Sequence, residues 1–325
     1  MQTPVSRRTA LKSLSSGFGY LAFAGLAQQA AGDDSSDRGP LAPKATHFPA
    51  TAKRVIFLSM NGGPSHLDLF DHKPKLADHE GRSTANSVIA QNKGLMSSPF
   101  KFAKHGESGL WFSELCPHLA KHADDLCFIH SMHTDLPNHS QAFIQMHTGS
   151  FQFTRPSIGA WSLYGLGTEN QNLPAYVVLR DPEGYSTYGK QLWSSGWLPA
   201  QFQGVEFSSG ETPVRHLNPT VPLPPGAQRA QLNTLEKLNR QHQSWHPGES
   251  ELEARIQNYE LAARMQLAAT DVLDISNESE ATRKLYGLDN SQCDHFARQC
   301  LMARRLVERG VRFIQIYSGG SDNQH

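Results

Sequence analysis

The chain has few cysteines and none in a metal-binding pattern. It contains 4 Cys among 325 residues, and none of the spacings forms a C-x-x-C pair. Cys293 and Cys300 would lie about 10 Å apart along a shared helix, which is too far for a disulfide. The sequence therefore predicts mostly free or buried thiols, and it argues against a zinc–thiolate site.

The chain also lacks an excess of charge and a long apolar run. Its 30 basic and 30 acidic residues give a net charge of +0, which argues against binding to nucleic acid or to an anionic membrane. No apolar segment is long enough to form a stable membrane span. Beyond residue 31 there is no G-x-S-x-G motif, which disfavours a serine hydrolase of the α/β-hydrolase type.

The first residues have the pattern of an export signal. Arg7 and Arg8 precede a weakly apolar segment, residues 13–31, that is rich in Ala, Gly and Ser. This pattern is typical of a twin-arginine signal peptide. We expect residues 1–31 to be the signal peptide, residues 32–52 a polar leader, and the protein to be periplasmic or secreted. The twin-arginine export machinery is then one of its partners.

The rest of the chain alternates between strand and helix patterns. Strands are predicted at 54–60, 98–102, 126–129, 175–179 and 311–317, and helices at 113–123, 227–243, 251–273 and 291–309, with another helix ending near 147–149. Such an order predicts an α/β fold with a parallel sheet and helical crossovers. The spacing of Gly184 to Lys190 is that of a phosphate loop, but Gln191 replaces the expected Ser or Thr, so we expect no nucleotide site.

Polar residues of one kind follow three of the predicted strands. Ligands bind at the carboxyl ends of parallel strands, and Asp and His are ligands for zinc, manganese and related ions. Two such ions can hold the attacking and leaving oxygens in ester hydrolysis. A single polar loop after a strand is more often a plain connection, so the prediction rests on the recurrence of these residue types. The three sets are Asn61, His66, Asp68 and Asp71; His133, Asp135, Asn138 and His139; and Asp322 and His325.

The predicted last strand is followed by only a few residues. Residues 318–325 form a Gly-rich segment that carries Asp322 and His325, and there the sequence stops. A core strand of an α/β domain normally continues into a helix. We therefore expect residues 53–325 to be an α/β domain that is incomplete at its C-terminus; the alternative is a frayed natural tail.

Several motifs together resemble a known family. They include the run from Lys53 through Gly62-Gly63-Pro64-Ser65-His66-Leu67-Asp68, then Ser131-Met132-His133-Thr134-Asp135, His147-Thr148-Gly149 and Arg155-Pro156-Ser157-Ile158-Gly159-Ala160-Trp161. The sequence resembles the bacterial twin-arginine-exported family of unknown function numbered fifteen-oh-one. That family is similar to the alkaline phosphatase and sulfatase superfamily. The resemblance implies a three-layer α/β/α sandwich that hydrolyses phosphate or sulfate esters at a metal site.

This sequence matches only part of the site-residue pattern of the superfamily. Sulfatases have paired Asp after the first strand, where this chain has Asn61 and Gly62. The nucleophile motif maps to His139 and Ser140 and contains no Cys, which disfavours the formylglycine mechanism. Either Ser140 attacks directly, or His139 is a ligand and water attacks. The resemblance implies a zinc, manganese or calcium site formed by Asn61, His66, Asp68, His133, Asp135, Asp322 and His325.

Two functions are compatible with these observations. The first is an exported, metal-dependent hydrolase of sulfate or phosphate esters, acting on a small-molecule or polysaccharide substrate and expected to be inactive as this 325-residue form. The second is a secreted protein on the same fold that binds carbohydrate or a surface without catalysis. The neutral Asn61 favours the second function, and the repeated His and Asp loops favour the first.

Overall fold

The structure is a computed structural model that describes most of the chain. The described residues are 40–82, 94–182, 184, 188–208, 213–214, 224, 226–246 and 249–319. The predicted signal peptide, residues 1–31, lies outside them. So do Asp322 and His325.

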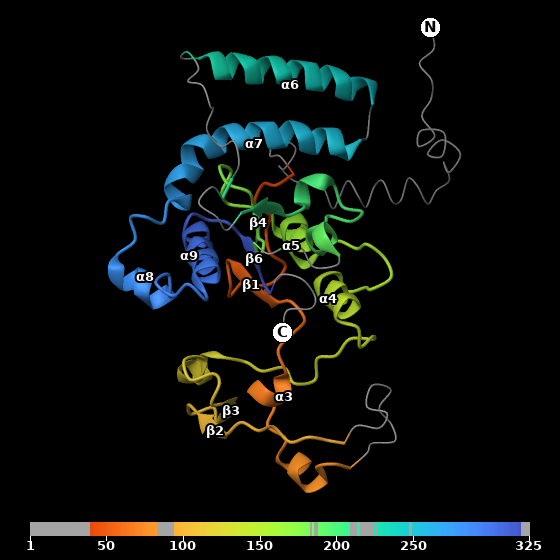
Figure 1. Cartoon of the computed structure of the whole chain (residues 1–325). Coiled ribbons are helices and arrows are strands. Elements are labelled where there is room, and N and C mark those ends of the chain that lie inside the picture. Colours follow the sequence, from red (N-terminus) through yellow and green to blue (C-terminus); the bar gives the residue numbers. More distant parts are fainter. Residues whose placement is uncertain are drawn as a thin grey trace, which may run out of the picture.

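A parallel sheet forms the centre of the protein (Figure 1). Its strands lie in the order β1-β6-β4-β5, and every neighbouring pair is parallel. β1, β4 and β6 confirm three of the predicted strands, whereas the three-residue β5 is too short to give a clear sequence signal. The strands are β1 (Val55–Met60), β4 (Tyr176–Leu179), β5 (Val205–Phe207) and β6 (Phe313–Ser318). The mixed α/β fold class is thereby confirmed.

Helices pack against both faces of this sheet, because β4 and β6 are apolar on both sides. On one face, Ile314 and Ile316 pack with α7 (Ser250–Leu273) and α9 (Asp294–Glu308). On the other, Phe313 and Tyr317 pack with α4 (His139–Thr148) and α5 (Ile158–Leu166). α4, α7 and α9 agree with predicted helices, and Gly149 ends α4 in the left-handed conformation.

The edge strand β1 is only partly covered. Its register places Ile56 beside Ile314 and Leu58 beside Ile316, so these side chains share the face that α7 and α9 cover at β6. Ile56, Leu58 and Met60 are nevertheless exposed. On the opposite face, the Phe57 ring contacts the His147 ring of α4. β1 is therefore packed on one side and largely open on the other.

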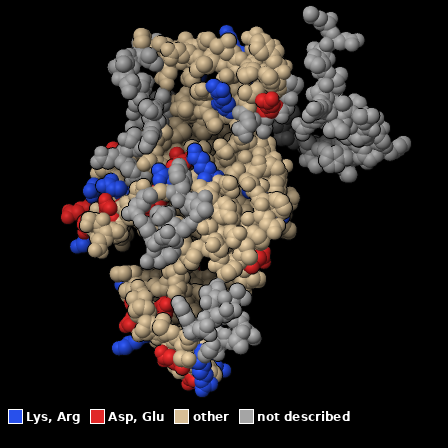
Figure 2. Space-filling model, turned by 45° about the vertical axis from the view of Figure 1, so that its right-hand side comes forward, with Lys and Arg blue, Asp and Glu red and all other residues tan. Residues whose placement is uncertain are grey.

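Further helices surround the central sheet. α6 (Ala227–Trp245) lies along α7 at the outside of the molecule and buries none of its residues (Figure 1). α8 (Glu280–Tyr286) precedes α9, and two short helices, η3 (Gly189–Trp193) and η4 (Ala200–Phe202), lie between β4 and β5. Charged residues on the face in Figure 2 form small, mixed groups, which agrees with the balanced composition.

A smaller lobe contains the segments between β1 and α4. It consists of α3 (His66–Leu69), η1 (Pro74–His79), the antiparallel hairpin β2 (Phe102–His105) and β3 (Leu110–Ser113), and η2 (Leu119–Asp125). Phe112, Ala120 and Ala123 form its core, with Phe70 and Phe128 packed against them. The lobe therefore has a hydrophobic cluster of its own, apart from the sheet.

Three predicted elements of this lobe differ from the structure. Residues 113–123 do not form one helix, because Ser113 ends β3 and Pro117 cannot continue a helix from there. Residues 126–129 are extended but pair with no described strand; the Phe128 ring instead packs on Phe70 and Phe112. The strand predicted at 98–102 begins only at Phe102.

The structure shows the state of the cysteines and the length of the apolar helices. Cys116, Cys127, Cys293 and Cys300 are all free, as the spacing predicted. Burial raises the pKa of the Cys300 thiol to about 11, so this thiol is unreactive at neutral pH. Among the described residues, no helix is long and apolar enough to cross a membrane.

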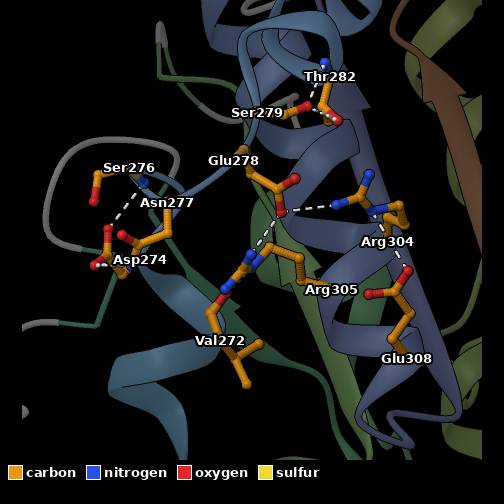
Figure 3. A network of polar contacts seen from close by, with 10 residues as sticks. All are labelled: Val272, Asp274, Ser276, Asn277, Glu278, Ser279, Thr282, Arg304, Arg305 and Glu308. Atoms are coloured by element: carbon orange, nitrogen blue, oxygen red, sulfur yellow. Dashed lines mark hydrogen bonds and ion pairs between the residues drawn. The ribbon is translucent and has the colours of Figure 1, made fainter.

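A nearly buried carboxylate joins α9 to the segment before α8 (Figure 3). Glu278 Oε1 accepts hydrogen bonds from Arg304 at 2.7 Å and from Arg305 at 2.5 Å. The same interactions, that with Arg304 first, hold the pKa of Glu278 below its usual value. Arg305 also donates to the carbonyl oxygen of Val272 at 2.9 Å, so the network ties the end of α7 to α9.

Replacing Glu278 by Gln should destabilise the fold, because two guanidinium groups then lose their charged partner. We expect a loss of about 1–3 kcal/mol in the free energy of unfolding, measured by urea titration followed by circular dichroism. Glu308→Gln is the matched control, since Glu308 is 60% exposed and also faces Arg304, at 3.5 Å. The control should change stability by no more than about 0.5 kcal/mol. Equal losses in the two variants would contradict this interpretation.

Candidate functional site

The carboxyl ends of three adjacent strands meet at one edge of the sheet. Asn61 follows β1, Gly319 follows β6, and Asp181 lies just beyond β4. The backbone N–H of Asn61 donates to the Ser318 carbonyl oxygen at 2.8 Å. The backbone N–H of Gly319 donates to Asp181 Oδ2 at 3.0 Å. Asn61 and Asp181 are both buried. Parallel sheets bind ligands at this edge.

The start of α9 adds a histidine to this edge. His295 Nε2 lies 3.8 Å from Asp181 Oδ2. One helical turn later, Gln299 Nε2 donates to the Arg180 carbonyl oxygen at 2.7 Å, while the buried Gln299 Oε1 has no hydrogen-bond partner among the described residues. The Arg180 side chain pairs with Glu206 at 2.8 Å. We refer to Asn61, Asp181, His295 and Gly319 as the strand-end cluster.

The predicted ligands that follow Asn61 belong to the smaller lobe. Asp68 lies in α3, and hydrogen bonds from Ser98 and then Ser65 lower the pKa of its carboxyl group. The pKa of Asp71 is lowered mainly by Lys73, whose Nζ lies 2.8 Å away. His130 Nδ1 lies 3.7 Å from the same carboxylate. His66 is exposed on α3. These residues lie next to the hairpin core rather than among the buried strand ends.

The second predicted group surrounds the N-terminus of α4. Asp135 Oδ2 accepts a hydrogen bond from Gln145 Nε2 at 2.6 Å, and His133 is exposed. Asn138 caps the helix: its Oδ1 accepts from the Ser140 amide at 3.1 Å. His139 and Ser140 are therefore the first two residues of a ten-residue helix, where the helix dipole favours negative charge.

The predicted metal ligands thus divide among three places in the described chain. Asn61 lies in the strand-end cluster, His66 and Asp68 lie in the smaller lobe, and His133 and Asp135 lie beside α4. Within residues 40–319, as far as they are described, no group of three or more His, Cys, Asp or Glu side chains is arranged to hold a metal ion. Asp322 and His325, the remaining predicted ligands, lie outside the described residues.

The family of the chain follows from its sequence over nearly its whole described length. Residues 52–325 match the family described as "Protein of unknown function (DUF1501)". The chain is a member of the DUF1501 family. The resemblance to this family is thereby confirmed. No curated protein and no solved structure matches the chain.

Two residues of the strand-end cluster of this DUF1501 protein were missed by sequence reasoning. Asp181 comes two residues after β4, so the rule that selected Asn61 could have found it. His295 lies in the first turn of a helix that is remote from β4 in the chain. No local pattern marks His295, because its proximity to Asp181 depends on how α9 packs on the sheet.

A buried histidine lies on the α4 face of the same sheet. His147 Nδ1 donates to the Phe143 carbonyl oxygen at 2.7 Å, while Nε2 has no hydrogen-bond partner in the part of the chain that the structure describes. The rings of Phe57, Phe143 and Tyr317 surround it. Burial lowers the pKa of His147 to about 4, so the imidazole is neutral at pH 7 and is part of the core.

Proposed function

We propose that this DUF1501 protein is an exported, metal-dependent hydrolase of sulfate or phosphate esters, with its site at the strand-end cluster. The observation that carries the proposal is the meeting of β1, β6 and β4 at Asn61, Gly319 and Asp181. This edge is where α/β enzymes of the open-sheet type bind their substrates. Helices on both faces of the sheet support a three-layer sandwich of the alkaline phosphatase type.

The donors of the cluster are of the right chemical type for a divalent ion. A carboxylate and an imidazole bound to one zinc ion at about 2.0–2.2 Å lie roughly 3.4 Å apart in tetrahedral geometry. The 3.8 Å between Asp181 Oδ2 and His295 Nε2 is near this spacing and longer than a hydrogen bond. Asn61 would add an amide oxygen as a further ligand. A bound zinc, manganese or calcium ion would supply charge stabilisation for the ester oxygens.

The described residues alone do not complete a ligand set. Our proposal assigns Asp322 and His325 to the same edge, because they follow Gly319 in the chain by a few residues. His66, Asp68, His133 and Asp135 are retained as candidates for a second ion. Such an assignment needs the smaller lobe and the start of α4 to approach the sheet edge.

Ser140 is the candidate nucleophile of the proposed reaction. It is partly buried in the first turn of α4, where the helix dipole favours a developing negative charge. His139, its neighbour, is exposed and is the candidate proton acceptor. In the other version of this mechanism, His139 binds the metal and a water molecule attacks the ester.

The proposal also includes export by the twin-arginine machinery to the periplasm or the exterior. Arg7, Arg8 and the weakly apolar residues 13–31 support it. Replacing both arginines by lysine should keep the protein in the cytoplasm, as measured by cell fractionation. Accumulation of the double variant in the periplasm at the normal level would contradict the export proposal.

The hydrolase proposal makes a direct prediction about metal and activity. Full-length protein loaded with zinc, manganese or calcium should hydrolyse an aryl sulfate or aryl phosphate, whereas the 325-residue form should not. Asp181→Asn should weaken metal affinity by about 10–100-fold. His242→Gln is the control, since His242 is exposed on α6 and should change neither quantity. Metal content by atomic emission and turnover of the two esters are the measurements. No bound metal and no turnover of either ester would contradict the proposal.

A second candidate function is a secreted carbohydrate- or surface-binding protein without catalysis. The specific observation that favours it is Asn61, which is buried at the end of β1 where the resembled superfamily uses a carboxylate. A neutral amide is a weaker metal ligand than a carboxylate. Under this alternative the protein binds sugar but contains no stoichiometric metal, so the metal analysis distinguishes the two functions.

A further inference from the structure

Three aromatic side chains stand together at the surface of α5. The exposed fractions of Trp161, Tyr164 and Trp197 are 45%, 44% and 63%. Trp161 and Tyr164 are three residues apart in α5 and therefore share one face of the helix. Trp197 comes from the loop after η3. We call these three residues the aromatic platform; exposed apolar side chains in such a group mark interaction sites more often than scattered ones do.

The rings of the platform lie close together without covering one another. The ring centroids of Trp161 and Trp197 are 6.4 Å apart with an angle of 75° between the rings. Those of Trp161 and Tyr164 are 5.9 Å apart with an angle of 81°. Because the pairs meet edge to face rather than as a stack, ring surface remains open to solvent. A flat ligand with an apolar face can lie against it.

The backbone under the platform is well fixed. The Ser157 amide donates to the Ser194 carbonyl oxygen at 3.0 Å, which ties the loop of Trp197 to the start of α5. Gly196 has a φ of 56° and its backbone abuts Arg155 and Pro156, so a side chain at position 196 would collide with them. A site that is rigid before binding loses less entropy when the ligand arrives.

The inner end of the platform is also held in place. The ring of Tyr164 meets that of Phe202 edge to face at 5.4 Å. Lys44 Nζ donates to the Tyr164 carbonyl oxygen at 2.6 Å and lies 5.1 Å from the centroid of the Tyr164 ring. This ammonium group therefore marks one end of the aromatic surface with a positive charge.

A second exposed cation, Arg155, precedes the start of α5. Its backbone contacts Gly196, the residue before Trp197. Neither Arg155 nor Lys44 forms an ion pair with any residue that the structure describes. Two cations on this part of the surface, neither paired with an acidic residue that the structure describes, together with open rings favour a ligand that is apolar on one face and anionic at its edge. The balanced net charge of +0 disfavours a long polyanion held by charge alone.

We propose that the aromatic platform binds the sugar rings of a sulfated polysaccharide, with Lys44 and Arg155 beside its sulfate groups. A pyranose ring presents C–H groups on its face and hydroxyl or sulfate groups at its edge, which matches apolar rings flanked by cations. The choice of sulfate rests on the proposed function. Binding and hydrolysis are nevertheless separate properties, and the platform holds the chain on which a sulfatase would act.

The test is calorimetric binding of dextran sulfate and of unsulfated dextran of the same length to the full protein. We expect tighter binding of dextran sulfate, and about a tenfold loss of affinity for it in Trp161→Ala and in Trp197→Ala. The matched control is Trp245→Ala, because Trp245 is 68% exposed but lies on α6. Lys44→Gln and Arg155→Gln should weaken binding of dextran sulfate and leave binding of dextran unchanged.

The possible results separate this inference from the hydrolase proposal. Unchanged affinity in the double variant Trp161→Ala/Trp197→Ala, or an equal loss in Trp245→Ala, would overturn the platform. Each variant is compared with the parent by its thermal unfolding midpoint, so that a folding defect is recognised. Platform binding without ester turnover would keep this inference and refute the hydrolase, whereas turnover without platform binding would do the reverse.

Discussion

The protein should lose about 3 kcal/mol of stability as the pH falls from about 6.5 to about 4, because His147 must accept a proton when the chain unfolds. The pKa of His147 in the fold is about 4, against an ordinary value of 6.5. The unfolded chain therefore binds the proton first, and stability falls with pH in this window. Above about 6.5 the contribution is complete, and below about 4 no more is lost.

The variant that tests this effect is His147→Gln. It removes the titrating ring and should flatten the plot of unfolding free energy against pH between about 6.5 and 4, whatever its effect at pH 7. Urea titrations at intervals of half a pH unit give the measurement. His242→Gln, which removes an exposed imidazole, should retain the slope. A slope in His147→Gln equal to that of the parent would refute the assignment.

The acidic groups should not obscure this window. The pKa values of Asp68, Asp71 and Glu278 all lie below their ordinary values of 3.8 or 4.5. For such a carboxyl group, the stabilising contribution is present above the unfolded pKa and is lost as the pH falls toward the folded one. The loss of stability caused by protonation of these carboxyl groups therefore begins at a pH where the loss caused by His147 is nearly complete.

Replacing either of two glycines of α5 by alanine should change the stability of the fold, in opposite directions at the two positions. A Cβ at Gly159 would overlap the ring of Tyr176, whereas a Cβ at Gly165 has nothing within 4 Å. Tyr176 is fully buried and its hydroxyl donates to Gln315 Oε1, so the ring has little room to move. Gly159→Ala should therefore destabilise the fold by about 1–3 kcal/mol.

Gly165→Ala is the internal control for this experiment. Alanine is a better helix former than glycine, so this variant should gain about 0.5–1 kcal/mol. Both values come from urea unfolding followed by circular dichroism at pH 7. If Gly159→Ala were as stable as Gly165→Ala, α5 would not pack on Tyr176 as closely as described. The position of Trp161 on α5 depends on this close packing.

The sequence predicted the sheet well where strands are buried on both faces. Residues 175–179 are a continuous apolar run and residues 311–317 a mostly apolar one; they correspond to β4 and β6, and such segments are typical of strands buried on both faces. The run at 126–129 looks similar but contributes Phe128 to the small core of the hairpin lobe. The local sequence pattern predicts that these residues are buried, but it does not predict which residues they pack against.

The site was predictable only in part, for the same reason. Asn61 and Asp181 closely follow strands, so a search for polar residues at the ends of predicted strands can find them. His295 lies near Asp181 only because of how α9 packs on the sheet. His66 and Asp68 follow β1 in the chain, but α3 turns away into the smaller lobe, where Phe70 packs on Phe112. Closeness in sequence to a strand end therefore did not guarantee closeness in space.

The position of β1 has a consequence for the order in which the protein forms during synthesis. β1 is the first described strand in the chain and its sheet partner β6 is the last, so the ribosome releases β1 long before its partner exists. A pairing between such distant segments forms slowly. Until then, the apolar segment Val55–Met60 of the nascent chain has no strand partner and is prone to aggregate. A chaperone that shields it during translation would raise the yield of folded protein.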